Sequence, residues 1–241
     1  TGALLITTND SGTDAAGNVT IYAGSGAALD FGTSTIDGGL VARSGHATGI
    51  TDSGVVTVRG TSSFQTTFTD ADISLGTSTL GDGNGTDTIT LNTIGSGGNA
   101  TLDNGTTKIV LGTSDVGGKL ILTTGNALGI TDVGDQTTPT VKVGRHLSAT
   151  TNANNGVINL DSLAVEGTIA LATNDDANND TAHATIWNTC SNCSHGLKFD
   201  TTEAAAGTAQ AGSTSTTVKL AAVASSTDDT YNSMSVYISS G

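Results

Sequence analysis

FGTSTIDGGL, at residues 31–40, recurs twice along the chain, as LGTSTLGDG at residues 75–83 and as LGTSDVGGKL at residues 111–120. A second segment, GHATGITDSG at residues 45–54, recurs as GNALGITDVG at residues 125–134. The outer copies of the first segment and the two copies of the second are both 80 residues apart (112 − 32 and 129 − 49). Such repetition is typical of a solenoid, in which stacked units share one continuous core.

The middle copy of the first segment divides the 80-residue interval unevenly. Its Gly76 follows Gly32 by 44 residues and precedes Gly112 by 36 (76 − 32 and 112 − 76). We therefore expect coils of roughly 20 residues that are joined by loops of different lengths.

Composition and patterning both favour β-structure. The 241 residues include 33 Gly and 1 Pro, and only 3% are aromatic, so Val, Ile, Leu and Ala must fill the interior. A narrow solenoid interior suits that supply. Short alternating or apolar segments bounded by Gly, Asn or Asp predict strands. They lie at residues 19–22, 55–58, 71–75, 88–91, 108–111, 120–122, 141–143, 157–160 and 168–171. Because no window sustains a helical period, we expect an all-β fold.

The chain is strongly acidic. It has 8 Lys and Arg against 22 Asp and Glu, which gives a net charge of −14. A nucleic-acid partner is excluded, because binding to phosphates needs clusters of cations that this sequence lacks. No stretch approaches the roughly 18 consecutive apolar residues of a membrane-spanning helix, so no membrane span is expected.

The two ends of the sequence are strand-like. The chain starts without Met in an apolar run and stops after another, which suggests a processed subunit or part of a longer protein. Unpaired main-chain groups on such edges can pair with another chain. We therefore predict assembly strands at both ends, formed by Leu4, Leu5 and Ile6 and by Val236, Tyr237 and Ile238.

One region resembles a known family. GITDSGVVTVRGTSSF at residues 49–64, followed by ADISL at residues 71–75, resembles the repeats of filamentous-haemagglutinin-type exoproteins, the large secreted bacterial adhesins. The second copy, from Ile130 to Leu160, is similar but carries an insertion around Pro139. The resemblance implies a right-handed parallel β-helix at a bacterial cell surface over residues 1–173. Residues 174–241 differ in composition from the repeats before them and are expected to form a cap or a small β unit.

The C-terminal region contains both cysteines. Cys190 and Cys193 are two residues apart and could form a tight disulfide, a redox pair or half of a zinc site, for which His183 and His195 are the only local partners. We favour a disulfide, because an extracellular β protein folds in an oxidising compartment.

Two acidic turns are candidate calcium-binding sites. GNGTDTI at residues 83–89 matches part of the β-roll nonapeptide, in which carbonyl and Asp oxygens of successive turns share an ion. Hydrogen-bonded Asx turns explain the same residues, and the β-roll needs consecutive copies where this chain has one. No cofactor is expected; calcium could bind at these turns, with candidate ligands Asp82, Asn84, Asp87, Asp175, Asp176 and Asp180.

Catalytic motifs are missing from the sequence. His46, His146, His183 and His195 belong to no paired nucleophile or metal motif. Asp52 and Asp132 recur at equivalent repeat positions, as turn residues do. We therefore expect a non-enzymatic protein.

The sequence as a whole predicts an extracellular structural or adhesive protein that is a subunit or segment of a cell-surface filament. Its partners would be other copies of the chain or contiguous parts of a larger chain, together with surface glycans. One alternative is a pilin-like β-sandwich subunit that exchanges strands. The other is a β-helix that binds or cleaves carbohydrate.

Overall fold

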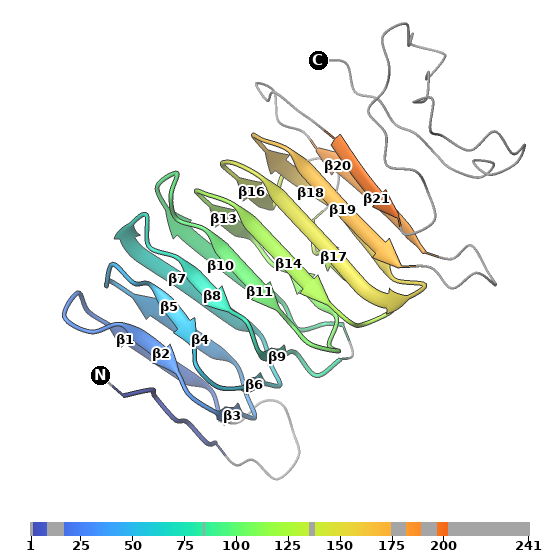
Figure 1. Ribbon diagram of the computed structural model, residues 1–241. Helices are drawn as coiled ribbons and strands as arrows, with labels where there is room; N and C mark the ends of the chain where they lie inside the picture. Colours follow the sequence, from blue (N-terminus) through green and yellow to red (C-terminus); the bar gives the residue numbers. More distant parts are fainter. Residues whose placement is uncertain are drawn as a thin grey trace, which may run out of the picture.

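The chain folds as a parallel β-solenoid of about 7 turns, whose strands stack in chain order along one axis (Figure 1). The computed structural model describes residues 2–8, 17–83, 85–134, 138–174, 182–188 and 197–201. Within those ranges the regular secondary structure is all strand, without helix. The expected all-β solenoid is confirmed, and the alternative of a β-sandwich is wrong because the strands pair in parallel from coil to coil.

The first three coils have three faces, each covered by one sheet. The first sheet begins with β1 (Val19–Ala23), β4 (Leu40–Ser44) and β7 (Ser62–Thr69). The second sheet begins with β2 (Leu29–Phe31), β5 (Ile50–Asp52) and β8 (Ile73–Leu75). The third sheet consists of β3 (Ser34–Ile36), β6 (Val56–Val58) and β9 (Ser78–Leu80).

The later coils have two faces, because the third sheet ends at β9. The first sheet continues with β10 (Ile89–Ile94), β12 (Ile109–Leu111), β13 (Ser114–Val116), β15 (Ile130–Asp132), β16 (Val141–Val143), β18 (Val157–Val165) and β20 (His183–Asn188). The second continues with β11 (Ala100–Asp103), β14 (Leu120–Thr124), β17 (Leu147–Asn154), β19 (Ile169–Asn174) and β21 (Leu197–Thr201). The stacking thus runs past residue 173, where β20 pairs with β18 and β21 with β19.

The 80-residue repeat spans three and a half turns. The first copy of the Gly-Thr-Ser segment joins β2 in the second sheet to β3 in the third, and the middle copy joins β8 to β9 on the same two faces two turns later. The last copy joins β12 to β13, which both lie in the first sheet. The interval of 44 residues therefore corresponds to two turns, and that of 36 residues to one and a half turns. The same Gly-Thr-Ser sequence thus forms corners on opposite sides of the solenoid.

A buried serine holds this corner. The Ser34 hydroxyl donates to the carbonyl of Gly32 (3.0 Å) and accepts from the Ile6 amide of the preceding coil (3.1 Å). Ser114 repeats both contacts, with the Gly112 carbonyl at 3.0 Å and the Leu91 amide at 3.1 Å. Because the hydroxyl satisfies polar groups of two coils at once, the chain can turn sharply without leaving buried main-chain groups unpaired.

Aliphatic side chains fill the interior, as the composition predicts. One row of the second sheet places a buried residue above its equivalent in each coil, namely Leu29, Ile50, Ile73, Ala100, Leu120, Leu147 and Ile169. Two rings join this core, where Phe31 and Phe64 meet edge to face at a centroid distance of 6.5 Å. The alternating in-and-out pattern of each strand thus builds one continuous apolar column.

Asn104 closes the third sheet. Its fully buried side chain accepts from the Leu80 amide (2.7 Å) and donates to the Leu80 carbonyl (3.0 Å), so one amide group takes the place of a neighbouring strand. The same Nδ2 also lies 3.1 Å from the Lys108 carbonyl. Asn104 thus caps β9, the last strand of the third sheet, at the point where the solenoid changes from three faces to two.

Candidate assembly site at the N-terminal end

Residues 2–8 form an additional strand-like segment on the first coil. Leu4 bridges Phe31 of the second sheet and Thr7 bridges Thr35 of the third, both in parallel. The Leu4 amide donates to the Asp30 carbonyl (2.7 Å), and the Ile6 carbonyl accepts from the Thr35 amide (2.8 Å). The predicted N-terminal assembly strand, Leu4 to Ile6, therefore lies at the end of the stack (Figure 1).

The outer edge of this segment is open. Main-chain bonds to the first coil come from Leu4, Ile6 and Thr8, whereas Leu5 makes no main-chain bond to any residue that the structure describes. The Leu5 side chain is 70% exposed and that of Leu4 is 38% exposed, while Ile6 packs against the core. An exposed edge with apolar side chains is a template for another strand.

The corner glycine of the first coil makes room for this segment. A Cβ atom on Gly32 would lie 3.0 Å from Leu5 Cδ1 and 3.2 Å from Ala3 Cβ. The last copy of the corner has the same constraint, since a Cβ on Gly112 would lie 2.7 Å from Thr90 Oγ1. The glycine is therefore needed for close approach of the coil beneath it.

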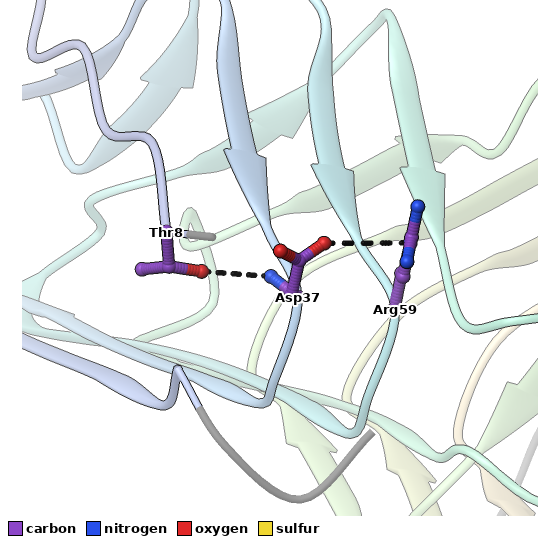
Figure 2. Close-up of polar contacts among 3 residues, drawn as sticks. All are labelled: Thr8, Asp37 and Arg59. Carbon is purple, nitrogen blue, oxygen red and sulfur yellow. Dashed lines mark hydrogen bonds and ion pairs between the residues drawn. The ribbon is translucent and has the colours of Figure 1, made fainter. Parts of the chain in front are cut away.

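A contact across three coils anchors the segment, as Figure 2 shows. The Asp37 amide donates to Thr8 Oγ1 (2.8 Å), and Asp37 Oδ1 lies 3.5 Å from Arg59 Nε. The carboxylate is nearly buried, whereas the guanidinium is half exposed, so the ion pair itself contributes little. Sequence reasoning missed this contact, because the three residues are far apart in the chain and the Asp37 position of the repeated segment is Gly81 and Gly117 in the other two copies.

The repeated aspartates bind the corner of the next coil. Asp52 accepts from the amides of Gly76 (2.8 Å) and Thr77 (2.9 Å). Asp132 accepts equivalently from the amides of Asp161 (3.3 Å) and Ser162 (2.9 Å). Both residues therefore have the structural turn role that their recurrence in the sequence predicts.

The second of these corners holds two carboxyl groups. Asp161 stands where the first corner has Gly76, so its side chain meets that of Asp132. Burial, together with a hydrogen bond to Asp161, raises the pKa of Asp132 to about 6. Asp161 Oδ1 is buried without a hydrogen-bond donor, and a proton on Asp132 would supply one.

The first calcium candidate is a glycine-rich loop that precedes β10. The Asp82 amide lies 3.3 Å from Asp87 Oδ2, which closes the loop on itself. A Cβ atom on Gly85 would lie 3.3 Å from Lys108 Nζ, so an ammonium group already lies beside the loop. Across the part of the chain that the structure describes, no three acidic, His or Cys side chains gather as metal ligands. Calcium binding here stays a prediction.

Several predicted sites lie outside the described residues. These are Cys190, Cys193, Asn84, Asp175, Asp176, Asp180, Val236, Tyr237 and Ile238. The disulfide, the second calcium candidate and the C-terminal assembly strand therefore stay predictions, as does the division of the chain at residue 173.

Comparison with known proteins identifies no relative of the chain. No helix long and apolar enough to cross a membrane occurs in the described ranges. No protein-family model, curated protein or solved structure matches the sequence.

Proposed function

We propose that this chain is a non-enzymatic, extracellular segment or subunit of a bacterial surface filament, of the filamentous-haemagglutinin type that its repeats resemble. Its role would be to build length and to present an adhesive surface. A solenoid suits this role because every coil adds extent while burying its face on its neighbour.

The observation that carries the proposal is the open edge at residues 2–8. Leu5 presents an exposed side chain, and its main-chain groups bond to no residue that the structure describes. A strand from a second copy would extend the solenoid, bury that side chain and satisfy those groups.

The test is a charge substitution on this edge. Leu5→Lys should prevent strand addition, because a desolvated ammonium at the joint would be costly. Leu128→Lys is the matched control, since Leu128 is also exposed, at 61%, but lies in the turn after β14. Sedimentation velocity over a range of concentrations, with electron microscopy of the same samples, measures assembly.

We expect filaments or larger species for the unmodified chain and for Leu128→Lys, and monomers for Leu5→Lys. Dispersed monomers of the unmodified chain would contradict the proposal. So would a Leu5→Lys variant that assembles as well as the control.

A further inference from the structure

A shallow hollow lies on the outer side of the first sheet, on a different face of the first coils from residues 2–8, which bridge to the second and third sheets. Its walls include Tyr22 on β1, Arg43 on β4 and Thr67 on β7, and the turn residues Gly24 and Ser25 line the rest. Tyr22 and Arg43 are direct partners in the parallel register, so their side chains leave the sheet one strand spacing apart, about 4.8 Å.

Both of these side chains are available to a ligand. Tyr22 is 70% exposed although it is one of few aromatic residues in the chain. Arg43 is exposed, and no acidic side chain of the described residues lies within ion-pair distance of it. The other residues that line the hollow are neutral. An uncompensated guanidinium beside an open ring is unusual in a chain with a net charge of −14.

From this geometry we infer that the hollow binds a sugar unit that carries a carboxylate, such as a uronic acid residue of a surface polysaccharide. A pyranose ring would pack its C–H groups on the negative face of the Tyr22 ring. The planar fork of Arg43 would hold the carboxylate by two parallel hydrogen bonds. Gln65, the next residue in this outward row, adds an amide beside Arg43 for a neighbouring hydroxyl group.

This inference rests on the adhesive part of the proposed function and names its ligand. Its test is separate from that of assembly, because the hollow is lined by the first sheet, whereas residues 2–8 bridge to the second and third sheets. Binding is therefore measured both on the unmodified chain and on Leu5→Lys, so that failure of assembly and failure of binding are separate results.

The experiment is calorimetric titration with a galacturonate oligosaccharide, with the neutral galactose oligosaccharide of equal length as the control ligand. Physiological salt is used, where exposed charges more than about 8 Å apart are largely screened. Tyr22→Ala and Arg43→Gln should each weaken binding by about tenfold or more, since each removes a direct contact. Arg145→Gln is the matched control variant, because Arg145 is also exposed and its loss changes the net charge equally.

Preference for the acidic ligand, lost in both hollow variants and retained in Arg145→Gln, would support the site. Three results would overturn it. They are absence of binding, equal binding of the neutral ligand, and an Arg145→Gln effect as large as that of Arg43→Gln.

Discussion

The transition from three faces to two depends on Asn104, and Asn104→Ala tests it. The substitution leaves the amide and the carbonyl of Leu80 without their partners, in a residue that is 1% exposed. Each of the two orphaned buried groups costs about 1–3 kcal/mol, so the local loss should be about 2–6 kcal/mol.

Native-state hydrogen exchange is the suitable assay, because solenoid coils can open locally and a single unfolding midpoint averages over them. The Leu80 amide should exchange about 30-fold faster or more in Asn104→Ala, which corresponds to the lower end of that range. Amides of β17 and β19, several coils away, should change little.

Asn99→Ala is the control. Asn99 also makes several hydrogen bonds, including one from its Nδ2 to Asp72 Oδ1, but these are exposed to water. Water can replace its partners, so the cost should be about 1 kcal/mol or less. If Leu80 exchanged no faster in Asn104→Ala than in Asn99→Ala, the side chain would not be closing the sheet and the reasoning would be refuted.

Two further substitutions test the corners. Gly49 has a φ of +79°, and a Cβ there would collide with the Asp72 carbonyl, so Gly49→Ala should lower the free energy of unfolding by about 3 kcal/mol or more in urea titration. Gly26→Ala, which meets nothing within 4 Å, should change it by less than about 1 kcal/mol, and equal effects would contradict the geometry. The raised pKa of Asp132, about 6, means that the folded chain binds a proton more tightly than the unfolded chain. The contribution of this site to folding should therefore be complete below the ordinary pKa of 3.8 and be lost as the pH rises through about 6. Asp161→Gly should remove part of the gain in urea midpoint between pH 7 and pH 5, and an unchanged gain would contradict the carboxyl pair.

Nine strand segments between Val19 and Leu171 could be predicted, because an alternating or continuous apolar pattern with flanking Gly, Asn or Asp is a local property. Other strands, such as β3, β5 and β13 within the repeated segments, were not predicted, because three residues are too few to show a period. The longer loop around Pro139 was also foreseen, since it interrupts the second copy of an otherwise repeated segment.

The phase of the coils could not be predicted in the same way. Gly32 and Gly112 stand in nearly identical segments, yet their corners lie on different faces of the solenoid. The difference arises in the intervening coil, where Asn104 ends the third sheet and shortens the path around the core. An isolated asparagine between two strands has no signature that separates such a role from an ordinary turn residue.

The candidate sites show the same contrast. The apolar run at Leu4 to Ile6 indicated an extended segment, and the structure pairs that segment with the first coil, whereas its role in assembly stays a prediction. The Tyr22 and Arg43 pair was not, because it depends on the register between two strands, and register is fixed by contacts across the stack.

Disulfide trapping of the register between β11 and β14 tests the solenoid most directly. Thr101 and Ile121 are direct partners on the outer side of the second sheet, at a strand spacing of about 4.8 Å that a disulfide can span. In a background with Cys190→Ser and Cys193→Ser, mild oxidation of Thr101→Cys with Ile121→Cys should give one cross-link, identified by mass spectrometry of the linked peptides. If the 80-residue repeat instead spanned a whole number of turns, Ile121 would occupy the position equivalent to Val41, which is in the first sheet. Cross-linking of Thr90→Cys with Ile121→Cys, in place of the predicted pair, would contradict the structure.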